Sequence, residues 1–127
     1  MDTKVHLTDL HTEKQNWLSA LALSKDEIES FENRLEEIAK ANNQVEITSK
    51  VEHFQNQFIR QREVMDILVH DIHAAESAMA HQVEANPVAT EHKTAPDHTE
   101  LRDRAETFTN LFAELKTEFN TFAAKTL

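Results

Sequence analysis

Residues 45–85, VEITSKVEHFQNQFIRQREVMDILVHDIHAAESAMAHQVEA, carry the strongest helical pattern in the chain, and the other segments must pack against them. This stretch contains neither proline nor glycine, and its apolar residues recur at steps of three and four, which is typical of one face of a helix. A helix of this length extends for roughly 60 Å and cannot bury such a face alone. We therefore expect neighbouring helices of comparable length to cover it. The apolar face comprises Ile47, Val51, Phe54, Phe58, Met65, Leu68, Ile72, Ala75 and Met79, with one polar interruption at Gln61.

The preceding segment, residues 7–42, carries its apolar residues in a single heptad register. One heptad position holds Leu7, Leu21, Ile28 and Leu35 with an interruption at Lys14, and the other holds Leu10, Trp17, Phe31 and Ile38 with an interruption at Ser24. The residues from Ser24 to Glu27 also match a capping box, which is typical of a helix start. Because the register passes through Ser24 unbroken, we expect one long helix. A break at that residue would instead give a four-helix arrangement.

Asparagines at positions 42 and 43 predict the first turn, because asparagine tolerates the left-handed conformation in which many helices end. A turn this short makes the helices on either side of it antiparallel neighbours. The second helix is expected to end before Pro87, since the residue that precedes a proline disfavours helical geometry. Residues 86–96 have no periodicity, and we expect a mobile loop there.

A third helix is predicted for residues 97–125, with Asp97 as its N-cap and Glu100 three residues later. The sequence thus predicts a single all-α domain over residues 1–127, an antiparallel up-down-up three-helix bundle of long, coiled-coil-like helices at about 7–42, 45–85 and 97–125. The apolar face of the third helix comprises Leu101, Ala105, Phe108, Phe112, Leu115, Phe119 and Phe122.

The composition argues against most enzyme classes. The chain has no glycine, which phosphate-binding loops, dinucleotide fingerprints and nucleophile elbows require. It has no cysteine, so disulfides, thiolate metal sites and cysteine nucleophiles are excluded. The sequence also lacks the Glu-x-x-His pairs of di-iron bundles and the His-Glu-x-x-His motif of zinc proteases. We expect a non-enzymatic protein without a cofactor.

The net charge of −10 is spread along the chain and disfavours nucleic acid and anionic membranes as partners. The N-terminal residues lack the basic start and apolar run of a signal peptide, and no stretch approaches 18 apolar residues. We therefore expect a cytoplasmic protein. Eight histidines allow a further hypothesis of pH-responsive assembly, because protonation of all of them would bring the net charge to about −2.

Four large apolar residues fall beside or outside the predicted core faces, at Leu23, Ile59, Val64 and Ile67. We interpret them as a patch at mid-bundle that docks a second copy of the chain, giving a homodimer, or a partner helix. Apolar residues scattered singly over a surface are also common, and this simpler interpretation stays open.

Three residues of the second helix, Asp66, His70 and His73, share one face and could chelate zinc, nickel or copper. A solvated helix face is the simpler interpretation. The sequence favours a non-enzymatic helical bundle that acts through protein–protein contact as a scaffold or adaptor. The alternative is a metal- or small-ligand-binding bundle that uses this cluster or a pocket between aromatic layers.

Overall fold

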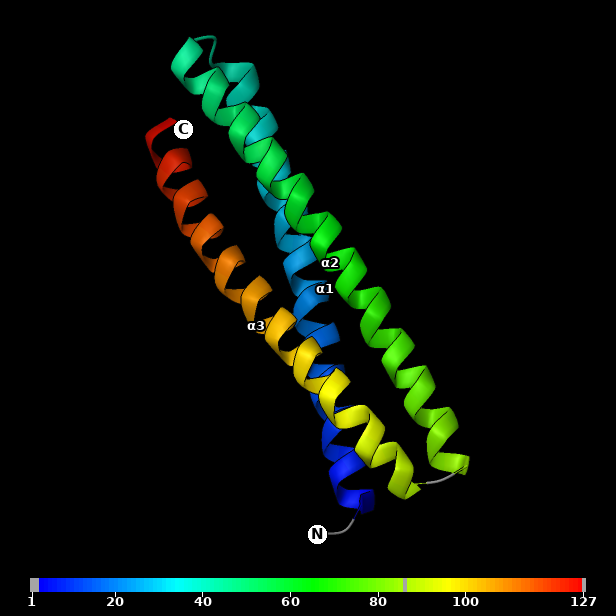
Figure 1. The fold of residues 1–127 in the computed structure, drawn as a ribbon. Helices are drawn as coiled ribbons and strands as arrows, with labels where there is room; N and C mark the ends of the chain where they lie inside the picture. The colour runs from blue at the N-terminus through cyan, green and yellow to red at the C-terminus, as the bar shows by residue number, and fades with distance from the viewer. Residues whose placement is uncertain (1–2, 86, 127) are drawn as a thin grey trace.

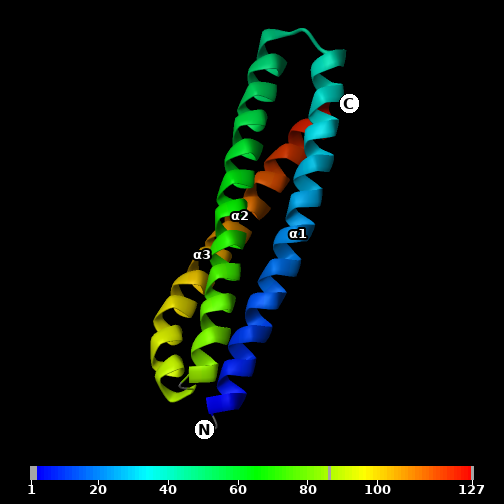
Figure 2. The same ribbon diagram turned by 90° about the vertical axis from the view of Figure 1, so that its right-hand side faces the viewer.

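The protein consists of three long helices that pack side by side (Figure 1). The structure is a computed structural model. It describes the backbone of residues 3–85 and 87–126 and the side chains of residues 7–82, 84 and 97–126. The helices are α1 (Thr3–Ala41), α2 (Val45–Ala85) and α3 (Pro87–Thr126). Each runs antiparallel to the one before it, so that the two ends of the chain lie at opposite ends of the bundle (Figures 1 and 2). The prediction of an all-α, up-down-up three-helix bundle is confirmed.

Helix α1 is continuous through Ser24, as the unbroken heptad register predicts. The Ser24 hydroxyl donates a hydrogen bond of 3.0 Å to the carbonyl of Ala20, one turn earlier in the same helix. A serine that bonds back to its own helix does not cap a new one. The alternative of a break into two shorter helices is therefore wrong.

Hydrogen bonds from side chains and from the backbone cap the two helix ends at the turn between α1 and α2. The Asn42 side-chain amide donates to the carbonyl of Ile38 at 3.0 Å, which satisfies one of the free carbonyls at the end of α1. At the start of α2, the carbonyl of Gln44 accepts the Thr48 backbone N–H at 2.9 Å and the Thr48 hydroxyl at 2.5 Å. No described residue has a positive φ, so the expected left-handed helix end at the asparagines is wrong.

Helix α3 begins earlier than the sequence suggests. Residues 87–96 belong to α3, so the mobile loop expected at residues 86–96 is wrong for residues 87–96, and residue 86 lies outside the described residues. Asp97 lies inside α3 instead of capping it. Proline suits the first position of a helix, because its φ angle is already helical and its missing N–H would have no partner there. Pro96 lies further inside α3, where it removes one intrahelical hydrogen bond without ending the helix.

The predicted apolar faces meet in one main core, in which Phe119 is a central residue. Phe119 is completely buried, and its ring centroid lies 5.2 Å from that of Phe31, 5.4 Å from Phe54 and 5.3 Å from Phe58. The rings of Phe31 and Phe58 also stack, at 5.8 Å, as the fold-back of α2 onto α1 predicts. Aromatic residues from all three helices thus pack together in this half of the bundle.

A second, smaller apolar cluster lies at the other end of the bundle and consists of Leu7, Leu10 and Met79. Along α1, Lys14 separates this cluster from the main core, which begins with Trp17 and Leu21. The interruption of the heptad register at Lys14 therefore marks a polar layer between two apolar ones. Over the described residues, no helix combines the length and the apolar content needed to cross a lipid bilayer.

Candidate functional site

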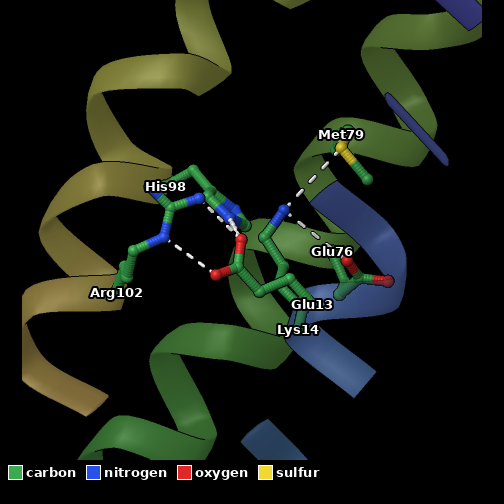
Figure 3. A network of polar contacts seen from close by, with 6 residues as sticks. All are labelled: Glu13, Lys14, Glu76, Met79, His98 and Arg102. Carbon is green, nitrogen blue, oxygen red and sulfur yellow. Dashed lines mark hydrogen bonds and ion pairs between the residues drawn. The ribbon is translucent and has the colours of Figure 1, made fainter. Parts of the chain in front are cut away.

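The polar layer is the most unusual side-chain arrangement in the bundle. All three helices contribute to it, and their side chains point toward one another across the bundle interior (Figure 3). We call these residues the polar layer: Glu13 and Lys14 of α1, Glu76 and Met79 of α2, and His98 and Arg102 of α3.

Lys14 is the buried cation of the layer, with 1% of its surface exposed. Its ammonium lies 3.6 Å from Glu76 Oε1 and 3.7 Å from the sulfur of Met79. Burial lowers the pKa of Lys14 below its ordinary value, and the neighbouring carboxylate of Glu76 opposes that shift. The imidazole of His11 contacts the other oxygen of Glu76. Glu76 thus joins α1 to α2 through two side chains.

Glu13 joins α1 to α3 in the same way. Arg102 donates two hydrogen bonds to its carboxylate, from Nε to Oε2 at 2.8 Å and from Nη2 to Oε1 at 2.7 Å. His98 Nε2 lies 2.6 Å from Glu13 Oε1. Hydrogen bonding to Arg102, assisted by His98, lowers the pKa of Glu13 to about 2, and the carboxylate raises the pKa of Arg102 in return. Glu13 is therefore ionised over the whole neutral range.

The geometry favours a neutral His98 whose Nε2–H donates to Glu13. The ring is 2% exposed, and its Nδ1 is buried without a hydrogen-bond partner. A proton on Nδ1 would have no acceptor and would add a positive charge near Lys14 and Arg102. Burial lowers the pKa of His98, and these two cations lower it further, whereas the hydrogen bond to Glu13 raises it.

The contacts of the polar layer favour one register between the three helices. The formal charges of two carboxylates, one lysine and one arginine cancel, and each contact joins two different helices. In a bundle, a buried polar group at a core heptad position penalises any register that separates it from its partners. Because Lys14 and His98 are almost fully buried, we assign the layer a role in fixing helix register.

Sequence reasoning recognised Lys14 only as an interruption and placed His98 beside a mobile loop. One signal could have found both. His98 lies three residues before Leu101 and seven before Ala105, so it extends the spacing of the buried face of α3 toward the N-terminus of that helix. A histidine and a lysine at core heptad positions of two helices indicate a buried polar contact.

The four residues of the predicted interaction patch are all exposed, at 66% for Leu23, 48% for Ile59, 42% for Val64 and 58% for Ile67. A further exposed apolar side chain, Leu111 of α3 at 49%, was not among the predicted ones. Binding of a partner by these residues stays a prediction. The ion pairs between helices show which side of the bundle each of these residues occupies.

Leu23 and Ile59 lie on two different sides of the bundle. Ile59 precedes Arg62 by three residues, and Arg62 pairs with Glu32 at the outer side of the α1–α2 interface. Leu23 precedes Glu27 by four residues, and Glu27 pairs with Lys116 of α3 at 3.1 Å, at the outer side of the α1–α3 interface. The structure therefore does not bring these two residues together.

Val64 and Ile67 lie on the remaining side, at the outer side of the α2–α3 interface. They precede Asp71 by seven and four residues, and Asp71 pairs with Arg104 of α3 at 2.8 Å. Since α2 and α3 are antiparallel, moving two turns back along α2 and two turns forward along α3 sets Val64 opposite Leu111. We call Val64, Ile67 and Leu111 the α2–α3 apolar face.

The predicted metal ligands do not converge. Asp66 lies 3.7 Å from Lys25 of α1, whereas His70 Nδ1 lies 3.3 Å from Asp71 Oδ1. His73 is exposed and lines, together with Asp66, a groove of about 260 Å³ between α1 and α2. Among the side chains that the structure describes, no three histidine, aspartate or glutamate residues are arranged to hold a metal ion.

No protein family, no curated protein and no solved structure matches this chain.

Proposed function

We propose that this protein is a non-enzymatic helical bundle that acts through protein–protein contact, as a scaffold or adaptor. The observation that supports the proposal is the α2–α3 apolar face, where Val64, Ile67 and Leu111 are between 42% and 58% exposed. Exposed apolar residues on adjacent helices suit the apolar side of an amphipathic helix, from a second copy or another protein. Because the net charge is −10, we propose neither nucleic acid nor a membrane as the partner. We also propose a cytoplasmic location, because the sequence lacks the pattern of a signal peptide.

The ion pair beside the face supports this proposal. Asp71 and Arg104 flank the apolar residues at one end and place one acidic and one basic group at the edge of the surface. Apolar residues bordered by polar and charged groups are typical of interfaces that form between folded proteins. The polar layer would hold the register of the three helices and so keep these side chains in place on the surface.

The test compares charge substitutions on two sides of the bundle. Ile67→Glu is expected to leave helicity and thermal stability nearly unchanged, because Ile67 is 58% exposed, and to abolish dimerisation or partner binding. Ile59→Glu is the matched control, since Ile59 is similarly exposed but lies at the α1–α2 interface. The assembly is measured by light scattering of the purified protein and by recovery of partners with the tagged protein from its host. If Ile67→Glu assembles and recovers partners as the unsubstituted protein does, the proposal is wrong.

A further inference from the structure

A groove of about 410 Å³ lies between α2 and α3, near the end of the bundle that holds the C-terminus (Figure 1). It is remote from the polar layer, and it lies on the same side of the bundle as the α2–α3 apolar face, with Glu118 of the groove two helical turns beyond Leu111. Its volume falls within the range of about 300–1,000 Å³ that is typical of small-molecule sites. The groove therefore has room for one compact organic molecule.

Two phenylalanines form the floor of this groove. Phe54 of α2 is almost fully buried and Phe122 of α3 is half-buried, and their ring centroids lie 5.2 Å apart at an interplanar angle of 31°. His53 lies beside them, with its ring centroid 5.1 Å from that of Phe54 in an edge-to-face arrangement. Because Phe54 is almost fully buried, Phe122 supplies most of the apolar surface of the floor against which a planar ligand can pack.

The rim of the groove carries two lysines and one carboxylate, so its basic side chains outnumber its acidic ones. Lys50, His53 and Lys125 line the rim with Glu118 as the one acidic residue. Neither lysine forms an ion pair within the described part of the chain. Seven of the eleven described lysine and arginine side chains pair with carboxylates, whereas these two lysines, like Arg34 and Arg60, do not.

The remaining polar groups of the groove are already occupied. The hydroxyl of Thr117 donates to the carbonyl of Ala113 at 3.1 Å, and that of Thr121 donates to the carbonyl of Thr117 at 2.9 Å. Hydroxyls bonded to their own helix leave the two lysines and His53 as the donors that can meet a ligand. The available donors thus favour an anion, in a protein whose overall charge is strongly negative.

We propose that this groove binds a small amphipathic anion, an aromatic carboxylate or sulfonate. Its planar body would lie against Phe122, and its anionic group would lie between Lys50 and Lys125. Apolar contact with the floor supplies most of the affinity, and the cations select for negative charge. Glu118 opposes binding, because it places a carboxylate at the same rim.

The probe for the test is 8-anilinonaphthalene-1-sulfonate, an aromatic sulfonate whose fluorescence rises in apolar surroundings. We expect one site with a dissociation constant on the order of tens of micromolar, which is ordinary for a ligand of about twenty heavy atoms. N-phenyl-1-naphthylamine, the same molecule without the sulfonate, is expected to bind at least tenfold more weakly. Equal binding of the two probes would overturn the proposal, because it would mean that the cations do not contribute.

Four exposed substitutions locate the site. Lys50→Glu and Lys125→Glu should each weaken binding at least fivefold, and Glu118→Gln should strengthen it two- to threefold. Lys40→Glu is the control, because it makes the same charge change at an exposed lysine that already pairs with Glu36 at 3.2 Å, and it should leave affinity unchanged within twofold.

Circular dichroism in the near and far ultraviolet checks that every variant is folded, since this probe also fluoresces with loosely packed proteins. Unchanged affinity in both lysine-to-glutamate variants would place the probe elsewhere and overturn the proposal. Ile67→Glu should bind the probe like the unsubstituted protein. This result separates the groove from the proposed interaction face, so that either proposal can fail alone.

Discussion

The imidazole of His98 on α3 lies against the indole of Trp17 on α1, with their ring centroids 4.9 Å apart and their planes inclined by 30°. Trp17 packs against the main apolar core, so this contact joins the polar layer to that core. It also shields one face of the imidazole from water, while the ring edge reaches Glu13. One histidine therefore contributes to both apolar packing and the charged contacts of the layer.

The burial of His98 predicts that the bundle loses stability in mild acid. The pKa of His98 is lowered in the folded protein, so the unfolded chain binds its proton first as the pH falls below about 6.5. Stability should be highest above that value and decline from there toward the lower pKa of the folded state. Lys14 and Arg102 disfavour the added charge and Glu13 favours it, and the net shift remains downward.

Urea unfolding between pH 7.5 and 5.5 measures this effect. His98→Phe keeps an aromatic ring beside Trp17 and should show a smaller decrease of unfolding free energy over that range. His73→Gln, at an exposed position of α2, is the control and should keep the slope of the unsubstituted protein. Identical slopes for all three proteins would contradict a neutral, buried His98.

Glu13→Gln should lower the free energy of unfolding at pH 7 by about 1–3 kcal/mol, because Arg102 and His98 lose the charged acceptor that they share. The pKa of Glu13 is about 2 in the folded protein against an ordinary value of 4.5. The stability it contributes is therefore present above pH 4.5 and is lost as the pH falls toward 2. Guanidinium unfolding at pH 7 and at pH 3 should give a larger difference between the two proteins at pH 7.

Glu36→Gln is the control for this comparison. Its carboxylate pairs with Lys40 at 3.2 Å on an exposed surface of α1, where an ion pair contributes little. We expect a change below about 0.5 kcal/mol. If Glu36→Gln lowers the free energy of unfolding as much as Glu13→Gln does, the stability that Glu13 contributes does not come from its contacts with Arg102 and His98.

The buried pair of Lys14 and Glu76 should show strong coupling in a double-mutant cycle. Glu76→Gln leaves an almost fully buried ammonium without its countercharge and should cost about 3–5 kcal/mol. Lys14→Met removes that charge and puts a flexible apolar side chain beside Met79. The double variant is therefore expected to be more stable than Glu76→Gln alone. Additive losses, measured by chemical unfolding, would mean that the two charges do not compensate each other.

Gln61→Leu should stabilise the bundle. Gln61 occupies a core position of α2, is 7% exposed, and has a buried Oε1 without a hydrogen-bond partner. Replacing an unsatisfied amide with an apolar side chain of similar size should raise the unfolding free energy by about 1–2 kcal/mol. The midpoint of thermal unfolding should rise by several degrees, whereas Gln55→Leu, at an exposed position, should leave it nearly unchanged. A lower midpoint for Gln61→Leu would mean that the amide is satisfied.

Part of the polar layer could be predicted from the sequence, and part could not. Lys14 stands out as a charged residue at a core heptad position of α1. His98 was missed because residues 86–96 were expected to be a loop, although they contain no glycine and lie between residues with strong helical periodicity. The loop prediction is wrong because Pro87 was expected only to end the second helix, and the N-cap pattern at Asp97 was expected to begin the third. In the structure, Pro87 begins α3 and Pro96 lies inside it.

The arrangement of the four predicted patch residues around the bundle could not be predicted from the sequence, for a different reason. Periodicity shows that Leu23, Ile59, Val64 and Ile67 point away from the core of their own helices. It does not show which neighbouring helix each one borders, because that depends on how three helices are arranged around the bundle axis. The ion pairs between helices supply this information, and they separate Leu23 and Ile59 from Val64 and add Leu111.

The sequence alone was enough to predict the existence of three helices, the continuity of α1 through Ser24 and nearly all of the apolar core, but not the start of α3 at Pro87. These features follow from the local chain, since helical periodicity selects which side chains face inward. Only the tertiary structure decided that Glu13 meets His98 and Arg102, and that Lys50 and Lys125 border one groove with Phe54 and Phe122. Such contacts join residues about 70 to 90 positions apart in the chain, so they depend on the register between helices. That register is set by the packing of all three helices together, and the periodicity of one helix does not contain it.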